Sequence, residues 1–489
     1  MELIPIIIYG LFLTFILLYS FVEFHLVIKF LFRKKLVDKK EPISHFPFVT
    51  IQLPIYNEAY VVEELIENIS KINYPKNKFE IQILDDSTDE TTDIISKKIL
   101  ELKSSGITFH HLRRENREGF KAGALAYGLL KAKGEFITIF DADFNPPVEF
   151  LNLTLPYFTS ENIGVVQTKW GHVNKNYSLI TRLQAFALDS HFTVEQVGRN
   201  TSNSFINFNG TAGVWRRKCI EESGGWKSDT LTEDLDLSYR AQLKKWKFIY
   251  LKDVVSPAEL PVEINGLKAQ QLRWSKGAAE CARKHLGTVL RDKTIGFTTK
   301  THASFHLLNS FLYICILAIA VMSLPVIYIV KNYPEHANLY SLFIIYYLGL
   351  FFITIGYLTS ELSLAKNKLL TFFEFIFIFP LFLSITMGLS LFNGVGVLEG
   401  YLGKKTSFIR TAKFNIKNRH SKWAHNKYAT KSLSPIVLFE GILSAYFVFC
   451  LVKVIDLQNY WAYPYFIMLS IGFGFVFLSS IVHLIKSRS

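Results

Sequence analysis

Long apolar stretches at both ends of the chain constrain its fold more than any other feature. Residues 4–19 are almost wholly apolar, and mainly apolar sequence continues to Phe32. Further runs of similar character occupy residues 305–330, 339–359, 434–452 and 462–485. A membrane-spanning helix needs roughly 20 apolar residues, which each of these runs can supply. Because the middle of the chain has ordinary mixed sequence, we expect an integral membrane protein with a globular domain between its membrane helices.

The first apolar run is expected to remain in place as a membrane helix. A signal peptide carries basic residues in front of its apolar core and a small-residue cleavage site behind it. This run has neither, and its basic residues Arg33, Lys34 and Lys35 follow it. Since positive charges gather at the cytoplasmic ends of membrane helices, we predict that the globular domain lies in the cytoplasm.

Residues 370–391 are long enough to cross the membrane, but the sequence after them argues against a crossing. Residues 393–432 contain nine Lys and Arg residues and a single acid, Glu399. Because such basic loops stay in the cytoplasm, we predict that residues 370–391 lie at the interface or re-enter without crossing. Five crossings then leave the tail with Lys486 and Arg488 inside. A sixth true span remains the alternative.

Charge and cysteine content narrow the possible classes. The chain has 54 basic and 41 acidic side chains, a net charge of +13. Basic ends of membrane helices explain this excess, so we expect no nucleic-acid partner. The four cysteines are far apart, with no Cys-x-x-Cys and no Cys/His cluster, which predicts neither a disulfide framework nor a zinc site.

The middle of the chain alternates strands and helices. Apolar, strand-like runs occupy residues 48–55, 79–84, 107–112 and 135–140. Helical apolar spacing occupies residues 60–70, 91–102 and 119–131. This alternation predicts a Rossmann-like α/β domain with a mostly parallel sheet, whose ligands bind beyond the carboxyl ends of the strands. The side chains expected at that edge are Tyr56, Asp85, Asp86, Asp141 and Asp143.

Asp141 and Asp143 directly follow an apolar strand. Buried carboxylates are costly unless they are paired or bind a cation, so this pair suggests a divalent-metal site. An acidic turn is the plainer interpretation of so short a motif, but the neighbouring acids at the same edge favour the metal.

The nucleotide fingerprints that depend on glycine-rich loops are missing from the sequence. No Gly-x-Gly-x-x-Gly follows the first strand and there is no Walker lysine loop, so dinucleotide oxidoreductases and P-loop enzymes fit poorly. A nucleotide held through carboxylates and a metal fits better. Lys121, with Arg113 and Arg114, could supply positive charge to its diphosphate, although the two arginines could equally form a solvated turn.

Three downstream stretches could also carry function. Glycines interrupt the strand-like residues 205–214, which indicates close approach of backbone or ligand. Thr232 is a plausible helix N-cap followed by Glu233, Asp234 and Asp236, an arrangement that ordinary helix starts share. In the helical stretch 266–284, an amide, a guanidinium and an indole share one face at spacing i, i+3 and i+4. These are Gln270, Arg273 and Trp274, and an interfacial helix anchored by its tryptophan would show the same pattern.

Taken in order, four of these motifs resemble the processive, membrane-embedded family 2 glycosyltransferases, which include cellulose, chitin and hyaluronan synthases. The motifs are Asp85-Asp86, Asp141-x-Asp143, Thr232-Glu233-Asp234 and Gln270-x-x-Arg273-Trp274. The resemblance covers about residues 48–300. Residues 208–215, 259–261 and 271–275 look most like the cellulose synthase-like A branch, which includes β-mannan and glucomannan synthases.

Phe408 to Lys413 resemble the cellulose synthase gating loop, Phe-x-Val-Thr-x-Lys. Arg410 stands where that loop has valine, which leaves a gating role open.

The resemblance implies a role for each motif. Asp234 would be the general base of an inverting transfer, and Asp141 and Asp143 would hold Mg²⁺ or Mn²⁺. Trp274 would stack on the terminal sugar of the acceptor. The nucleoside and diphosphate would be bound by Tyr56, Asp85, Asp86, Gln270 and Arg273.

These features together predict a multi-pass protein of the plasma membrane, or of the inner membrane in a bacterium. The expected parts are an N-terminal membrane helix (1–35), a cytoplasmic glycosyltransferase-A-type domain (45–300), membrane helices (301–360), an interfacial helix with a basic cytoplasmic loop (361–432) and C-terminal membrane helices with a short tail (433–489).

The leading hypothesis for function is transfer of a hexose from GDP-mannose or UDP-glucose to a β-linked polysaccharide, with passage of the polymer across the membrane. A non-processive enzyme acting on a lipid acceptor is the alternative, because ceramide glucosyltransferases carry a similar Gln-x-x-Arg-Trp. An inactive scaffold or a transporter fits less well, since every motif acid and the Arg-Trp pair are intact.

Overall fold

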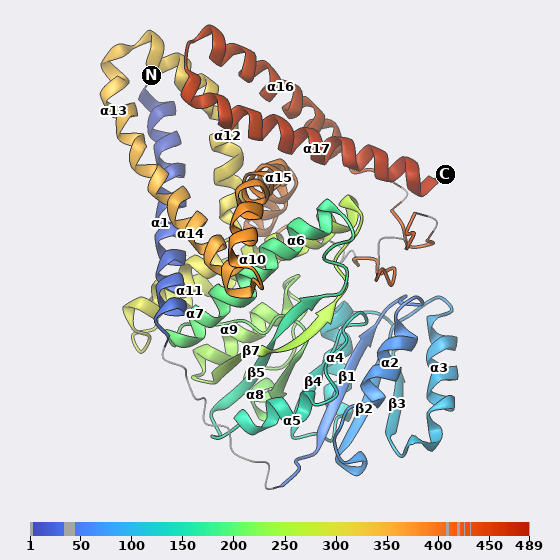
Figure 1. Ribbon diagram of the computed structural model, residues 1–489. Coiled ribbons are helices and arrows are strands. Elements are labelled where there is room, and N and C mark those ends of the chain that lie inside the picture. The colour runs from blue at the N-terminus through green and yellow to red at the C-terminus, as the bar shows by residue number, and fades with distance from the viewer. Residues whose placement is uncertain are drawn as a thin grey trace.

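The computed structural model describes residues 3–33, 45–406, 410–417, 421–424, 426–430 and 432–488. Figure 1 shows an α/β domain packed against a group of long helices, with the N-terminal helix running beside the others. This arrangement confirms the predicted insertion of an α/β domain between apolar helices.

The domain is built on one seven-stranded sheet with strand order β3-β2-β1-β4-β6-β5-β7. Neighbouring strands pair in parallel except for β6, which is antiparallel to both β4 and β5. The strands are β1 (Val49–Ile55), β2 (Phe79–Asp85), β3 (Thr108–Arg113), β4 (Phe136–Ile139), β5 (Ile163–His172), β6 (Gly213–Arg216) and β7 (Lys247–Ala258). The apolar runs of β1, β2 and β4 are buried, as expected of strands covered on both faces.

Helices cover both faces of the sheet. Ile51 and Leu53 of β1 pack with Leu65 of α2 on one face, whereas Ile137 of β4 packs with Leu125 of α4 on the other. The helices of the domain are α2 (Val62–Ser70), α3 (Thr91–Glu101), α4 (Phe120–Lys131), α5 (Phe150–Thr154), α6 (Leu179–Ser190), α7 (Gln196–Thr201), α8 (Arg217–Glu222), α9 (Glu233–Leu243), α10 (Ile264–Arg291) and α11 (Phe297–Leu307). A π-helix, His191–Glu195, joins α6 to α7.

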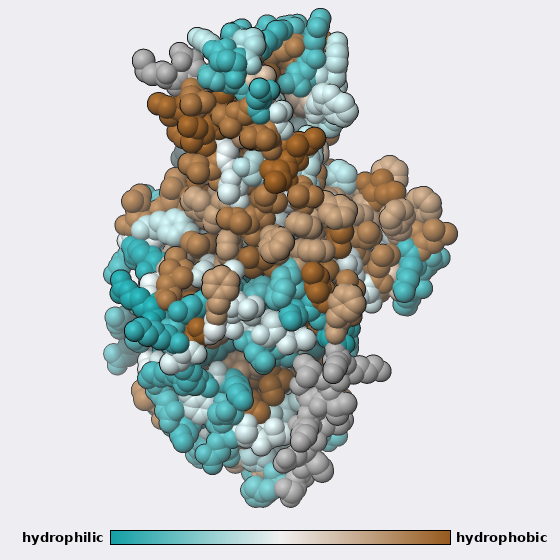
Figure 2. Space-filling model, turned by 90° about the vertical axis from the view of Figure 1, so that its left-hand side faces the viewer, coloured by the Kyte–Doolittle hydropathy of each residue, from teal (hydrophilic) through white to brown (hydrophobic). Residues whose placement is uncertain are grey.

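Long apolar helices make up the rest of the molecule. Figure 2 shows their hydrophobic side chains as a band between a hydrophilic cap and the hydrophilic surface of the α/β domain. The helices are α1 (Leu3–Leu31), α12 (Phe311–Asn332), α13 (Ala337–Ser341), α14 (Tyr347–Leu364), α15 (Lys368–Leu402), α16 (Ile436–Asp456) and α17 (Tyr463–Arg488). Among the described residues, six segments are long and apolar enough to span a membrane, and α15 is one of them.

Both ends of α15 contact the α/β domain. Near its start, Glu374 pairs with Arg182 of α6 at 2.9 Å. Near its end, Glu399 pairs with Lys276 of α10 at 3.0 Å. In Figure 1, α15 is seen nearly end-on, across the direction of α1 and α12. Contacts with the same domain at both ends of α15 are consistent with the interfacial position predicted for residues 370–391. That position stays a prediction.

The described part of the basic segment between α15 and α16 lies on the α/β domain. Lys413 pairs with Asp143 at 2.7 Å, and Lys417 pairs with Glu64 at 2.6 Å. The basic segment and the α/β domain are therefore on the same side of any membrane that the apolar helices cross. Several residues on which the sequence predictions drew lie outside the described residues: Lys34, Lys35, Phe408, Ile409, Arg419 and Lys431.

Candidate active site

A cavity opens at the carboxyl edge of the sheet, between the strand ends, α9, α10 and residues 410–413. It encloses about 1300 Å³, counting the part open to solvent. Nine of the residues that the sequence suggested for the site line it: Tyr56, Asp86, Lys121, Asp141, Asp143, Asp234, Gln270, Arg273 and Trp274. Side chains more than 200 positions apart in sequence therefore meet in one site.

Asp85 is not among the residues that line the cavity, and its contact with a nucleoside stays a prediction. Its carboxylate accepts hydrogen bonds from the backbone N–H of Ser87 (2.8 Å) and the hydroxyl of Thr92 (2.9 Å), and lies 2.9 Å from Nε2 of His111. Burial would raise the pKa of Asp85, but the hydrogen bonds from His111 and Ser87 hold it below its ordinary value. Asp85 fixes the loop that carries Asp86.

Asp86 reaches the cavity and is held in place by Arg114. Nε of Arg114 donates to Oδ1 of Asp86 at 2.9 Å, and Nη2 of the same guanidinium donates to Oδ2. Nη2 of Arg113 donates to the backbone oxygen of Ser87 at 2.9 Å. Neither arginine is among the residues that line the cavity, and both are bonded to the loop after β2.

Tyr56 lines the cavity and contacts two arginines. The guanidinium of Arg117 is 3.3 Å from the centroid of its ring, close enough for a cation–π interaction. Nη1 of Arg410 donates to its backbone oxygen at 2.9 Å, while Nε of Arg410 lies 3.2 Å from Glu58. Burial raises the pKa of Glu58 to about 8, although Arg410 opposes that rise.

Each carboxylate of the Asp141-x-Asp143 motif has a lysine partner. Nζ of Lys121 lies 2.5 Å from Oδ1 of Asp141 and donates to the backbone oxygen of Gly210 at 2.9 Å. Nζ of Lys413 donates to Oδ2 of Asp143 at 2.7 Å. Burial would lower the pKa of both lysines, but their carboxylate partners, first Asp141 and Asp143, raise it above the ordinary value.

The two aspartates fit a divalent cation that is shared with a substrate. Carboxylate oxygens are the ligands that Mg²⁺ prefers, and it commonly uses one or two of them together with phosphate oxygens and water. In the described part of the chain, no group of three or more His, Cys, Asp or Glu side chains converges on one point. Asp141 and Asp143 could hold a cation whose other ligands come from a substrate and from water.

Asp234 sits in the first turn of α9 beside Gly210. A Cβ atom added at Gly210, whose φ is +78°, would lie 3.0 Å from Oδ2 of Asp234. This glycine therefore allows the close approach that the sequence predicted. Burial raises the pKa of Asp234 to about 7, and the neighbouring charge of Glu233 adds to that rise. A carboxylate with such a pKa can accept a proton near neutral pH.

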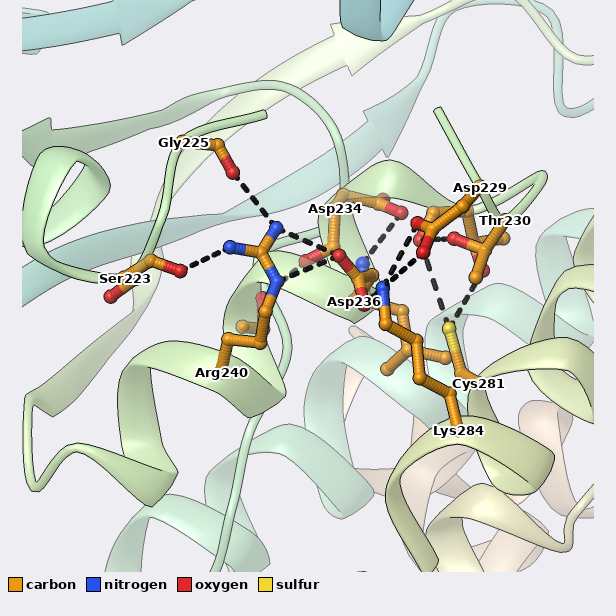
Figure 3. A network of polar contacts seen from close by, with 12 residues as sticks. Ser223, Gly225, Asp229, Thr230, Asp234, Asp236, Arg240, Cys281 and Lys284 are labelled. Carbon is orange, nitrogen blue, oxygen red and sulfur yellow. Dashed lines mark hydrogen bonds and ion pairs between the residues drawn. The ribbon is translucent and has the colours of Figure 1, made fainter. Parts of the chain in front are cut away.

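A network of ion pairs ties α9 to α10 behind Asp234 (Figure 3). The fully buried Asp236 contacts Arg240 at 2.7 Å, Lys284 at 2.6 Å and His285 at 2.8 Å. Thr232 occupies the N-cap position, but its side chain does not cap the helix. Asp236 is thus a structural acid, whereas its neighbour Asp234 faces the cavity.

Close packing brings α10 against the start of α9. A Cβ atom added at Gly277 of α10 would lie 2.5 Å from Cγ2 of Thr232. From this helix Gln270, Arg273 and Trp274 line the cavity, so their predicted common face points into the site. Nη2 of Arg273 donates to the hydroxyl of Thr411 at 2.6 Å, which links α10 to the basic segment.

Residues 47–277 match the family model described as glycosyltransferase like family 2. The matched residues include all seven strands of the sheet and the first half of α10. Glucomannan 4-beta-mannosyltransferase 2 of Arabidopsis thaliana is 41% identical over 273 residues, 55% of this chain and 51% of that protein. Glucomannan 4-beta-mannosyltransferase 1 of Oryza sativa subsp. japonica is 39% identical over 308 residues, 60% of this chain and 59% of that protein. The chain spans about half the length of the curated relatives it matches.

The fold of the chain is also similar to that of a solved structure. A mannosyltransferase from Pyrobaculum calidifontis, solved in complex with GDP-Man and Mn²⁺, aligns with a TM-score of 0.55 and 19% sequence identity. The alignment covers 83% of this chain and 99% of that one. It shows that the two chains share a fold.

Among the residues that line the cavity, Glu58, Arg117, Arg410 and Lys413 had no site role assigned from the sequence. Glu58 and Arg117 follow strand ends, where a search of the sheet edge could have found them. Arg410 and Lys413 come from a segment far along the chain, and only the likeness to a gating loop pointed to them.

Proposed function

We propose that this protein transfers a hexose from a nucleotide sugar, with inversion, to a growing β-linked polysaccharide of the β-mannan type. The names of its relatives favour mannose and therefore GDP-mannose as donor, with UDP-glucose as the alternative. The observation that carries the proposal is one cavity that holds Asp234, the pair Asp141 and Asp143, and the face of α10 with Arg273 and Trp274.

Asp234 would act as the general base. It takes the proton of an acceptor hydroxyl while that oxygen forms a bond to the anomeric carbon of the donor sugar. The bond from the anomeric carbon to the nucleoside diphosphate breaks in the same step, and the diphosphate leaves with its electron pair. A pKa of about 7 leaves much of Asp234 deprotonated at neutral pH and still basic enough to accept the proton.

Positive charge in the cavity would stabilise the leaving diphosphate. Mg²⁺ or Mn²⁺ held by Asp141 and Asp143 would neutralise the charge that develops on it. The guanidinium of Arg273 can bind a phosphate through two N–H groups, and Gln270 can donate a hydrogen bond beside it. Lys121, which bridges Asp141 and Gly210, adds positive charge near the same place.

The nucleoside of the donor and the terminal sugar of the acceptor would contact different residues of the cavity. Tyr56 and Asp86, which line the cavity, would contact the nucleoside. Trp274 presents a flat apolar surface on which an acceptor sugar can stack. No covalent sugar–enzyme intermediate is needed, because a single displacement inverts the anomeric centre.

We also propose that the domain is cytoplasmic and that the polymer passes through the membrane part. The basic segment contacts the domain, and basic segments stay in the cytoplasm. Five crossings, with α15 lying at the interface, satisfy this rule.

The test is a donor screen with purified protein, GDP-mannose and UDP-glucose each being supplied with Mg²⁺ or Mn²⁺. The proposal expects a ladder of polymer lengths from GDP-mannose. A single-sugar lipid product would instead establish the lipid-acceptor alternative. An absence of binding and turnover with any common nucleotide sugar would contradict enzyme function and favour a scaffold or transporter.

A further inference from the structure

A chain of polar contacts leads from the cavity into the π-helix that joins α6 to α7. It starts at Asn209, which lines the cavity. Nδ2 of Asn209 lies 3.3 Å from Nε2 of His191, and Nδ1 of His191 lies 2.9 Å from Oε2 of Glu195. His191 and Glu195 are the first and last residues of the π-helix. Such π-helical turns occur frequently at functional sites.

The far end of this chain is anchored to the membrane helix α1. Arg199 is only 2% exposed, and its Nη2 lies 3.8 Å from Oε2 of Glu195 and 3.1 Å from Oε1 of Glu23 in α1. A buried guanidinium between two carboxylates keeps Glu195 available as a hydrogen-bond acceptor for His191.

The contacts of Gln196 determine which way the Asn209 amide points. Gln196 is fully buried, and its Nε2 lies 3.2 Å from the backbone oxygen of Asn207, which can only accept. The same Nε2 donates to Oδ1 of Asn209 at 2.8 Å. Asn209 therefore turns its oxygen to Gln196 and its Nδ2 to His191.

The orientation of Asn209 in turn determines the protonation of His191. Because Nδ2 of Asn209 can only donate, Nε2 of His191 must accept. The proton of the neutral imidazole then sits on Nδ1, where it is donated to Glu195. Only with the proton on Nδ1 of His191 does each of these hydrogen bonds, from Gln196 to Asn209, His191 and Glu195, join one donor to one acceptor.

We propose that His191 is a positioning residue that orients the Asn209 amide toward a sugar hydroxyl in the cavity. After its contacts with His191 and Gln196, Asn209 keeps one amide proton and one oxygen lone pair, and either can bond a hydroxyl group. The next residue, Gly210, accepts from Lys121 and adjoins Asp234, so Asn209 lies beside the place of transfer. This inference rests on the proposed function, since it needs a sugar in that cavity.

Three variants test the contact through kinetics. His191→Phe keeps a ring of similar size but loses both hydrogen bonds, so we expect a KM about tenfold higher for one sugar substrate, with kcat changed much less. His191→Gln can place an amide oxygen near the position of Nε2, and we expect it to restore KM to within about threefold of wild type. Glu195→Leu removes the acceptor of the Nδ1 proton and leaves the ring free to turn. It is expected to raise the same KM as His191→Phe, by a smaller factor.

These kinetics also identify the sugar. A rise in the KM of the nucleotide sugar places Asn209 on the donor, and a rise in the KM of the acceptor places it on the acceptor. His336→Phe, in the turn between α12 and α13, is the matched control and is expected to leave both KM values unchanged. Wild-type KM values for both substrates in His191→Phe, or no recovery in His191→Gln, would overturn the inference.

A measurement that needs no turnover separates this inference from the proposed function. The ring nitrogens of ¹⁵N-histidine-labelled protein report which one carries the proton, and His191→Phe identifies the signal of His191 among the 13 histidines. We expect a neutral ring protonated at Nδ1 in wild type. A wild-type ring protonated at Nε2 would refute the positioning role even if the enzyme is active. If His191→Phe unfolds, the spectrum of His191→Gln identifies the signal instead.

Discussion

The raised pKa of Asp234 predicts how the rate of sugar transfer depends on pH. Burial, and then the charge of Glu233, raise this pKa from 3.8 to about 7. A base must be deprotonated to work, so the rate should rise with pH through about 7 and then level off. At pH 6 only about a tenth of Asp234 would be deprotonated, and at pH 5 about a hundredth. A carboxylate with an ordinary pKa would instead leave the rate nearly flat above pH 5.

The assay is sugar incorporation by detergent-solubilised protein at saturating donor and metal between pH 5 and 9. Glu259 also lines the cavity, and burial raises its pKa to about 7 as well, so a second variant must assign the rising limb. Glu233→Gln removes the charge that helps to raise the pKa of Asp234, and therefore should move the limb to lower pH. Glu115→Gln, at an exposed position, should leave it in place. A flat profile between pH 5.5 and 8, or a limb that Glu233→Gln leaves unmoved or moves upward, would refute this reasoning.

Three further predictions follow from packing, topology and the metal site. Gly277→Ala places a methyl group 2.5 Å from Cγ2 of Thr232 and should lower the free energy of unfolding by about 1 to 3 kcal/mol. Gly287→Ala, in the same helix, places a methyl group with nothing within 4 Å and should raise the melting temperature slightly. The two melting curves test this, and equal effects of the two variants would contradict it. A single cysteine at Lys404, in a background without the native cysteines, should react with an impermeant reagent only from the cytoplasmic face, and labelling of intact cells would contradict the five-crossing topology. Removal of divalent cations with EDTA should abolish incorporation and added Mg²⁺ or Mn²⁺ should restore it, while full activity in EDTA would exclude a metal role for the two aspartates.

Much of the fold and of the site is encoded locally in the sequence. The strands of the parallel part are short apolar runs, and each ends in polar residues because the carboxyl edge of the sheet faces the cavity. The spacing of Gln270, Arg273 and Trp274 places them on one face of α10 wherever that helix packs. This local periodicity was sufficient to predict that most of the proposed site residues lie at the same edge of the sheet.

Other features depend on tertiary contacts that no local pattern encodes. Asp85 and Asp86 are adjacent acids at a strand end, and because successive side chains point to opposite sides, only one of them can face the cavity. The sequence does not say which one. Lys413 reaches Asp143 from a segment 270 positions away, and Arg117 meets Tyr56 through the fold of two separate loops. The antiparallel direction of β6 is likewise set by its partners β4 and β5 and not by its own four residues.

The most direct test of the account is Asp234→Asn, which removes the proposed base and keeps the size and shape of its side chain. Donor binding is measured by calorimetry and sugar incorporation under the same conditions. The account predicts binding close to that of wild type, with incorporation reduced by about 10² to 10⁴-fold. Incorporation near the wild-type rate with donor binding intact would contradict Asp234 as the general base.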